Sequence, residues 1–194
     1  MPFFIPGTTA KLSLIFIISF LGIFSNKNAQ TGALKSIRLD KTKSFINYHM
    51  SHPMHNWDGT SKDIDGIVQY DETTKKINKV VISVKINTFD SKNSNRDAHM
   101  LEITEGIKYP TVTFVSSSIK EDGNTVDISG TINFHGVSKQ IHFMGNESVI
   151  NNKKVINGEF VVLLEDFKIE RPSMMLMKTD NEMKMNFSVE YLMN

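Results

Sequence analysis

Apolar and polar residues alternate along most of the chain beyond residue 35, and this alternation constrains the fold more than any other feature. Successive side chains of a β-strand point to opposite faces, so a period of two predicts strands with one buried face. The clearest run places Val126, Ile128, Ile132 and Phe134 on one face, with polar residues between them. The pattern therefore predicts an all-β domain.

Further strands are predicted by the same alternation. They cover residues 44–50, 64–70, 80–87, 111–119, 137–144, 154–164 and 183–192, with another short strand at 35–39. Segments rich in Gly, Asn and Asp separate several of them, at residues 71–75, 121–124, 134–136 and 151–153. Such segments favour tight turns, so we expect consecutive strands to pair as antiparallel hairpins.

Residues 93–107 break this period and predict the one helix of the domain. Their apolar positions are Met100, Leu101, Ile103 and Ile107. The polar residues before them supply N-caps, and Gly106 is expected to end the helix. Residues 165–178 fit either a shorter helix or a loop.

About eight strands joined by short turns leave two main architectures, a sandwich or a sheet closed on itself. Closure removes the exposed edges, and an eight-stranded barrel is just wide enough to hold one small ligand, as in the lipocalins. We predict a lipocalin-like eight-stranded antiparallel β-barrel with one helix inserted between strands, over residues 31–194. Its inward Val, Ile, Phe and Met side chains favour an apolar cargo.

The first 30 residues have the pattern of a signal peptide. Lys11 is the only charge before the apolar run at 12–24, and small or polar residues follow up to Gln30. Because a membrane-spanning helix needs about 20 apolar residues, a cleaved signal is favoured over a permanent anchor. We expect cleavage after Ala29 or Gln30, and a mature protein that is periplasmic or secreted.

The charge and the absence of cysteine exclude several kinds of site. Removing residues 1–30 takes away Lys11 and Lys27 but no acidic residue, so the formal net charge falls from +1 to −1. The remaining lysines are scattered among acids, which argues against a nucleic-acid partner. A chain without cysteine has no disulfide and no thiolate metal site.

Three motifs resemble one known family. They are N-R-D-A-H-M-L at 95–101, K-Y-P-T-V-T-F at 108–114 and S-G-T-I-N-F-H-G-V-S-K at 129–139. In order and spacing they resemble the YceI-like, polyisoprenoid-binding family, over roughly residues 36–192. The resemblance implies an extended lipocalin-like barrel in the periplasm, whose lumen takes a long isoprenoid chain such as a quinone tail. It implies no catalytic residues.

Three histidines at intervals of three, His49, His52 and His55, form a candidate metal site. Residues three apart on a strand point to opposite faces, and Pro53 turns the chain between the second and third histidine. We therefore predict no metal there. Instead, these histidines and Trp57 are expected at the rim of the barrel, where they meet a polar head group.

Methionines gather near the C-terminus, at Met174, Met175, Met177, Met183 and Met185. Thioethers are soft ligands for copper(I), but flexible methionines also suit a pocket for a long hydrocarbon, and we favour the pocket. Arg96, Asp97 and His99 at the start of the helix suggest acid–base chemistry. We favour a structural role, in which Asp97 interacts with the positive N-terminus of the helix and Arg96 ties the helix to a loop carboxylate. We predict no catalytic residue, in a chain that carries no G-x-S-x-G or H-E-x-x-H motif.

The function predicted from these observations is non-catalytic binding, and sequestration or transport, of a long-chain isoprenoid or similar apolar lipid in the lumen. No cofactor is expected besides a bound lipid, and a homodimer is left open. The candidate lumen residues are Ile64, Val68, Val80, Ile82, Val84, Val126, Ile128, Ile132, Phe134, Ile141, Phe143, Phe160, Val162, Met185, Phe187 and Val189. Two alternatives stay open: a periplasmic metal- or quinone-dependent redox accessory protein that uses the His and Met residues, and a purely structural barrel with a filled core.

Overall fold

The computed structural model describes Met1 and residues 32–193. The predicted signal peptide, residues 1–30, lies outside this part of the chain apart from Met1. No helix among the described residues is long and apolar enough to cross a membrane.

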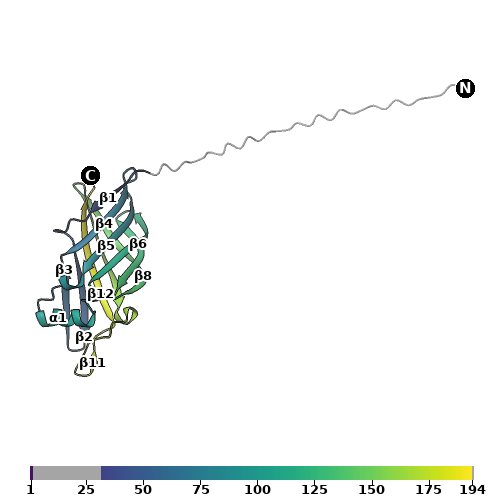
Figure 1. Ribbon diagram of the computed structural model, residues 1–194. Helices are drawn as coiled ribbons and strands as arrows, with labels where there is room; N and C mark the ends of the chain where they lie inside the picture. Colours follow the sequence, from purple (N-terminus) through teal and green to yellow (C-terminus); the bar gives the residue numbers. More distant parts are fainter. Residues whose placement is uncertain (2–31, 194) are drawn as a thin grey trace. The chain divides into compact units, whose positions relative to one another are not determined.

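Ten strands form one curled antiparallel sheet in the order β1-β4-β5-β6-β7-β8-β9-β12-β2-β3 (Figure 1). Their bounds are Leu34–Arg38 (β1), Phe45–His52 (β2), His55–Ser61 (β3), Ile64–Asp71 (β4), Ile77–Lys85 (β5), Thr111–Asp122 (β6), Thr125–Phe134 (β7), Val137–Ile150 (β8), Lys153–Leu163 (β9) and Glu182–Leu192 (β12). The remaining elements are the helix α1 (Ser94–Ile103), the 3₁₀ turns η1 (Ile86–Thr88) and η2 (Leu164–Phe167), and a small hairpin of β10 (Ser173–Met174) and β11 (Met177–Lys178).

The predicted all-β fold, an antiparallel sheet curled around its core with one helix, is confirmed, but the sheet has ten strands rather than eight and its edge strands β1 and β3 do not pair with each other. One addition is β1, predicted as a short extra strand. The other is β3, which contains His55 and Trp57, two residues predicted to lie at the rim because Pro53 turns the chain before them. It pairs with β2 from Ile46↔Ser61 to His52↔His55, so the segment continues the sheet instead of leaving it.

Hydrogen bonds beyond the strands join both edges of the sheet to the rest of the fold. After β1, the Leu39 amide donates to Gly66 O at 3.1 Å and the Asp40 amide to Glu190 O at 2.7 Å, which links β4 to β12. At the other edge, Thr60 of β3 pairs with Asp90 beyond η1. These bonds satisfy backbone groups that an open edge would leave exposed.

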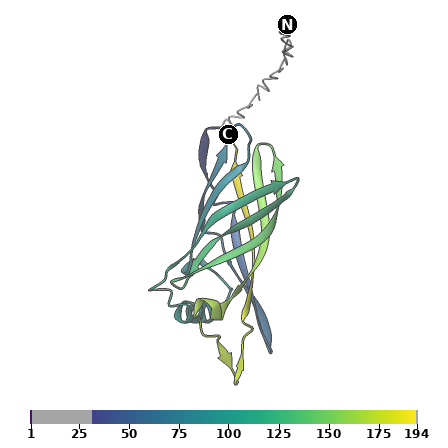
Figure 2. The ribbon, with the colours of Figure 1, turned by 90° about the vertical axis from the view of Figure 1, so that its right-hand side faces the viewer.

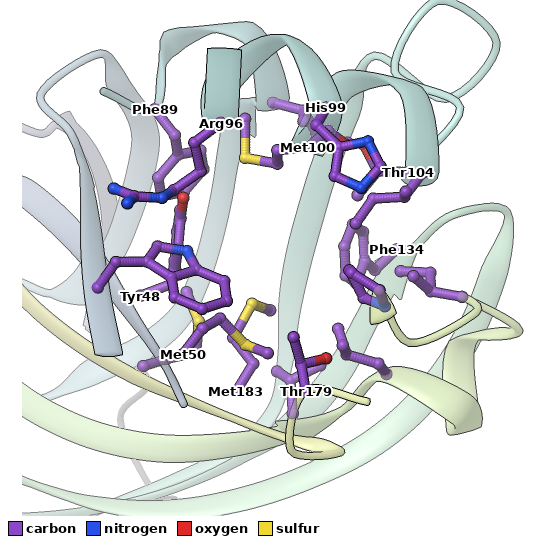
Figure 3. Close-up of a pocket in the computed structure, with 18 of the residues that line it drawn as sticks. Tyr48, Met50, Phe89, Arg96, His99, Met100, Thr104, Phe134, Thr179 and Met183 are labelled. Carbon is purple, nitrogen blue, oxygen red and sulfur yellow. The ribbon is translucent and has the colours of Figure 1, made fainter. Parts of the chain in front are cut away.

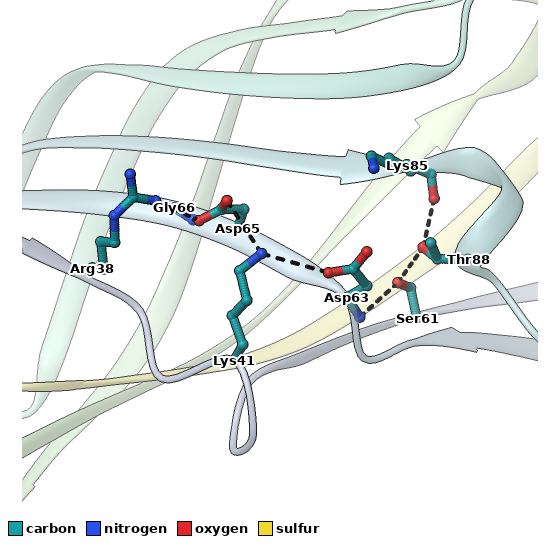
Figure 4. Close-up of polar contacts among 8 residues, drawn as sticks. All are labelled: Arg38, Lys41, Ser61, Asp63, Asp65, Gly66, Lys85 and Thr88. Carbon is teal, nitrogen blue, oxygen red and sulfur yellow. Dashed lines mark hydrogen bonds and ion pairs between the residues drawn. The ribbon is translucent and has the colours of Figure 1, made fainter.

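Polar side chains reinforce the segment between β1 and η1 (Figure 4). Lys41 Nζ lies 3.2 Å from Asp65 Oδ2 and 3.6 Å from Asp63 Oδ1. Ser61, which is fully buried, shares a 2.7 Å hydrogen bond with Thr88. The exposed ion pairs contribute little to stability, whereas the hydrogen bond between buried Ser61 and half-buried Thr88 fixes η1 against the end of β3.

Alternation specifies the inward face as predicted. All ten residues of β7 alternate between half-buried and buried, with the apolar residues on the buried side. Two-residue turns connect it onward: His135 and Gly136 join β7 to β8, and Asn151 and Asn152 join β8 to β9, all with positive φ. Such turns match the twist of antiparallel strands.

The helix α1 ends earlier than its sequence pattern indicates, at Ile103 rather than near Ile107, which is fully exposed. In the views of Figures 1 and 2, α1, η2 and the β10–β11 hairpin gather at one end of the sheet, and the C-terminal end of β12 lies at the other. The segment predicted ambiguously as a helix or loop, residues 165–178, contains most of η2 and the hairpin.

Candidate functional site

A cavity of about 480 Å³ opens at the end of the sheet that carries α1. Volumes of roughly 300–1,000 Å³ are typical of sites for small ligands. Figure 3 shows that Arg96, His99 and Met100 of α1 face Met50, Met183 and Thr179 across this space. We call it the outer cavity. Its wall is almost entirely apolar below the helix, so it favours a hydrocarbon.

The helix that covers the outer cavity is fixed at its N-terminal end by local hydrogen bonds. Asn93 is the N-cap, and its side chain accepts from the Arg96 amide at 3.1 Å. Asp97 accepts from the Ser91 amide at 3.1 Å, and the Arg96 guanidinium donates to Ser91 O at 3.4 Å. These contacts give Arg96 and Asp97 the structural roles expected of them, although Arg96 bonds a carbonyl rather than the loop carboxylate we had expected.

The C-terminal end of the helix has the Schellman hydrogen-bond pattern, with Glu105 in the left-handed position (φ 46°). The Gly106 amide donates to Leu101 O, and the Glu105 amide to Glu102 O. Glu105 thus takes the conformation that glycine usually takes, one residue before the glycine predicted to end the helix.

His135, in the β7–β8 turn, connects three elements around the cavity. Its Nε2 lies 2.8 Å from Glu105 Oε2 after the helix, and its Nδ1 lies 2.8 Å from Phe167 O of η2. Tyr109 packs edge-on against its ring at a centroid distance of 4.9 Å. This arrangement gives His135 a structural role and accounts for its place in the turn without catalysis.

Polar and aromatic side chains form a collar at the opening of the outer cavity. The Arg96 guanidinium lies 5.4 Å from the Trp57 ring centroid, and the His55 ring lies 5.2 Å from the same tryptophan. The His52 ring lies 5.5 Å from that of His55. Its Nε2 donates to Met177 O at 3.0 Å, and its Nδ1 accepts from the Met54 amide at 3.2 Å. The collar therefore offers cationic, aromatic and hydrogen-bonding groups to a ligand's polar end.

Two buried hydroxyls also face the outer cavity. Burial raises the pKa of Tyr48 to about 12, with the Asp97 carboxylate adding to the effect, so Tyr48 stays neutral at physiological pH. The Thr179 hydroxyl is buried and has no hydrogen-bond partner among the described residues. A buried polar group without a partner is costly, and a ligand hydroxyl or carbonyl would supply one.

Deeper in the barrel lies a second, smaller space of about 90 Å³, the inner cavity, with no polar surface. Three side chains, Ile46, Ile132 and Phe160, line both cavities. Phe160 also packs against Phe143 and Phe187, at centroid distances of 5.3 and 6.3 Å. The two spaces are thus neighbours separated by a thin layer of apolar side chains.

The structure places all the candidate lumen residues except Val126 on the wall of one or both cavities. Those on the outer cavity are Val84, Ile132, Phe134, Phe160, Val162 and Met185. Those on the inner cavity are Ile64, Val68, Val80, Ile82, Ile128, Ile132, Ile141, Phe143, Phe160, Phe187 and Val189. Val126 is fully buried and packs with Ile128 and Phe143, and it lines neither space. That the lining residues bind lipid remains a prediction.

Three of the candidate rim residues, His52, His55 and Trp57, line the outer cavity, but His49 does not. It lies within β2 on the outward face, with Nδ1 3.0 Å from Asp58 Oδ1. In residues 32–193 no three His, Cys, Asp or Glu side chains lie close enough together to hold a metal ion. The histidine run is therefore divided between the two faces of the sheet.

Several lining residues were absent from the sequence-based set. They are Leu39, Ile46, Tyr48, Met50, Ile86, Phe89, Met100, Ile103, Val112, Phe114, Ile156, Leu164 and Ile169, with polar residues of and next to α1, and Pro172, Ser173 and Thr179. Met174 and Met183, two of the methionines that we favoured for a hydrocarbon pocket, also line the outer cavity. Tyr48 and Met50 flank the polar His49, so the alternation of the sequence could have placed both on the inward face. The α1 residues had no such signal, because a period of two cannot show that a helix covers the barrel opening.

Comparison with known proteins gives the same assignment by two routes. The family model of the YceI-like domain matches residues 38–191. Protein YceI of Escherichia coli O157:H7 is 26% identical over 162 residues, covering 79% of this chain and 85% of that protein.

Solved structures with the same fold include BcnA of Burkholderia cenocepacia, with a TM-score of 0.71 and 16% identity over 78% of this chain and 98% of that one. Another is a polyisoprenoid binding domain from Saccharophagus degradans implicated in plant cell wall breakdown, with a TM-score of 0.66 and 17% identity over 84% and 100% of the two chains. A curled ten-stranded sheet, a helix across its opening and a family match over most of the chain lead to one conclusion: this protein belongs to the YceI-like family.

Proposed function

We propose that this protein binds, without catalysis, an amphiphile with a long apolar tail of the isoprenoid class, and sequesters or carries it. The observation that carries the proposal is the arrangement of the lumen: a polar collar at one end leads into two successive apolar cavities. An amphiphile has a matching arrangement, with a polar group at one end and an apolar chain behind it. The tail enters the barrel, and the head group stays at the collar.

The apolar wall supplies the affinity. Burial of hydrocarbon yields about 25 cal/mol per Å² of apolar surface, so several buried isoprene units offset the entropy lost on binding. Half-buried aromatic and methionine side chains, such as Phe160 and Met183, adapt to a branched chain because they border empty space. The polyisoprenoid-binding domain from Saccharophagus degradans shares the fold, which supports the choice of this lipid class.

The collar selects the head group by hydrogen bonding and stacking. A quinone or prenyl alcohol places an oxygen where Thr179 lacks a partner, and the Trp57 ring on the wall of the same cavity offers a flat surface for stacking. Arg96 and His99 add donors suited to an oxygen-rich head. A neutral or weakly anionic head group fits these contacts best.

Export belongs to the same proposal. A protein that carries a lipid between membranes must reach the compartment that separates them, and residues 1–30 have the composition of a signal peptide. We propose that the mature protein works in the periplasm or outside the cell.

The direct test is to purify the mature protein from its own host and extract its bound molecules for mass spectrometry. We expect one isoprenoid lipid in near-stoichiometric amount and no copper or zinc above background. Stoichiometric metal without lipid would overturn the proposal and favour the redox accessory alternative. A homogeneous protein that takes up no lipid even after exposure to prenyl alcohols would favour a structural barrel.

A further inference from the structure

We propose that the lumen measures tail length: Phe160 separates an outer from an inner compartment, and a buried ionic cluster around Lys154 closes the inner end. This inference rests on the proposed function and adds to it a rule for which tails bind well. The wall between the cavities, the two strands that run along both, and the cluster beyond them carry the argument.

Phenylalanine rings from four strands meet at the boundary between the cavities. Phe143 stacks on Phe160 at 5.3 Å and meets Phe187 edge-on at 5.6 Å, while Phe114 lies 5.8 Å from Phe143. Phe160 borders both cavities and is only half-buried, although it lies inside the barrel. A ring that borders a cavity on two sides is less restricted than a close-packed one, and we expect a rotation of Phe160 to join the two compartments.

Two inward glycines fix the rings behind Phe160. A Cβ on Gly158 would lie 2.6 Å from Phe187 Cζ, and one on Gly130 would lie 2.5 Å from Phe114 Cε2. Each ring therefore occupies the place of a missing side chain on the neighbouring strand, which holds it close to the sheet. Phe114 and Phe187 cannot move toward the sheet and Phe143 is buried, so Phe160, which borders both cavities, has the most room to move among the four rings.

Strands β9 and β12 form a continuous wall along both cavities. Inward residues of the two strands pair directly: Val162↔Met183, Phe160↔Met185, Gly158↔Phe187 and Ile156↔Val189. The first two pairs lie at the outer cavity, and Phe187, Ile156 and Val189 line the inner one. At about 3.3 Å per residue, this apolar wall is about 20 Å long.

The next inward pair along the same wall is Lys154↔Tyr191, and there the apolar surface ends. Lys154 is 3% exposed, and its ammonium lies 2.7 Å from Glu121 Oε2 and 2.9 Å from Glu147 Oε2. Glu121 also accepts from the Ile77 amide. A hydrocarbon tail cannot displace buried, mutually paired charges, because each would lose its partner in a dry environment.

Tail length then determines how much of the lumen a ligand uses. A short tail fills only the outer cavity. A longer tail turns Phe160 aside and reaches the inner cavity, and any tail beyond that meets the Lys154 cluster. Affinity is expected to rise with each added isoprene unit until the inner cavity is full, and then to stop rising.

Trp57 provides the readout, because it is the only tryptophan of the chain and lines the collar, where every head group binds. We would titrate the mature protein with geraniol, farnesol, geranylgeraniol and solanesol and follow tryptophan emission. The key variant is Val189→Phe, which fills the inner cavity. Its matched control is Val161→Phe, which adds the same bulk to the outward face of β9, where Val161 is 48% exposed.

Val189→Phe is expected to raise the dissociation constant of geranylgeraniol at least about ten-fold, which corresponds to the loss of about two buried CH₂ groups. The dissociation constant of geraniol should stay the same. Val161→Phe should change neither. Ile128→Phe, which fills the inner cavity from β7, repeats the test if Val189→Phe fails to give a cooperative thermal transition. Equal effects on short and long tails, or none in folded variants, would overturn the length rule.

The separating role of Phe160 has its own test. Phe160→Ala removes the largest side chain between the compartments, so in stopped-flow measurements the association rate of geranylgeraniol should rise by a larger factor than that of geraniol, which stays in the outer cavity. An unchanged association rate of geranylgeraniol would contradict the separating role of Phe160. If no prenyl alcohol alters Trp57 emission or co-elutes with the wild-type protein, the proposed function itself fails, a result distinct from equal binding of all lengths.

Discussion

At the scale of single residues, the inner end of the lumen depends on Lys154. Its side chain is buried at the end of an otherwise apolar wall, and it pairs with two carboxylates that are themselves mostly buried. Such a group is tolerated only because every charge has a partner. The arrangement stabilises the closed end of the barrel and also ends the space available to a ligand.

Replacing Lys154 with methionine should therefore destabilise the protein by about 3–5 kcal/mol, since it leaves Glu121 and Glu147 buried without their cation. Urea unfolding measures the change. The matched control is Lys153→Met, whose partner is Glu190 at 2.8 Å but whose side chain is 42% exposed. That variant should lose at most about 1 kcal/mol. Equal losses in the two variants would show that Lys154 is not held as described.

The alternation along a strand predicts which face of the sheet a side chain lies on, but not whether the side chain borders a cavity. The alternation placed Val84, Ile132 and Val162 on the inward face, where the structure has them. It did not separate Val126, which is inward but packs with Ile128 and Phe143, from residues that border empty space. Cavities depend on which side chains meet across the barrel, and that requires the register of all strands.

At the scale of elements, the helix over the opening is fixed by its two ends rather than by a buried face, since none of its residues is fully buried. The N-cap hydrogen bond that the Arg96 amide donates to Asn93 and the contact of Glu105 with His135 hold the helix across the cavity. An element held by its ends can move to admit a ligand while the sheet stays intact.

Asn93→Ala should destabilise the protein by about 1 kcal/mol, because the Arg96 amide loses its capping acceptor. Chemical denaturation gives the change in the free energy of unfolding. Hydrogen exchange should become faster in α1 of the variant than in α1 of the wild type, while the central strands keep their rates. Ser94→Ala, at the neighbouring exposed position, is the control and should have little effect. Unaltered exchange in α1 on loss of Asn93 would contradict the capping role.

The β10–β11 hairpin has an unusual turn. Met175 and Leu176 both have positive φ, at 51° and 64°, and Leu176 is fully exposed. Left-handed backbone costs about 1–2 kcal/mol for residues other than glycine, and Asn-Gly is the pair that this turn prefers. Met175→Asn with Leu176→Gly is thus expected to stabilise the protein by about 1 kcal/mol in urea unfolding.

The turn of Asn151 and Asn152 has the same backbone geometry and is the control, because Asn152→Gly should change stability far less. Destabilisation by the double substitution at the hairpin would mean that its methionine and leucine side chains make contacts worth more than the strain.

Elements were predicted best where one simple period governs them. The β4, β6, β7, β9 and β12 strands follow from alternation alone. The β3 strand was missed because turn-forming residues dominate its sequence, and pairing with β2 decides its conformation. The end of α1 was misplaced because Glu105 adopts the left-handed conformation that we had assigned to Gly106.

At the scale of the whole molecule, the barrel combines an empty lumen with a stable shell. Side chains around the two cavities lack partners on one side, so the unliganded protein forgoes packing energy that a bound tail restores. A ligand that fills these cavities would therefore stabilise the fold.

Removal of bound lipid by organic extraction should lower the thermal midpoint, and geranylgeraniol should restore it. A ligand at about one hundred times its dissociation constant stabilises by about 2.7 kcal/mol, which corresponds to a shift of a few degrees in a domain of this size. Calorimetry of extracted and reloaded protein measures the effect. An identical midpoint in both states would indicate that the lumen is filled by its own side chains.

The most direct test of the central claim is a crystal structure of the mature protein with geranylgeraniol. We predict the hydroxyl at the collar near Trp57 and Thr179, and continuous density for the tail past a rotated Phe160 into the inner cavity. Density on the outer surface of the sheet, or an unchanged Phe160 with empty cavities at saturating ligand, would contradict the account.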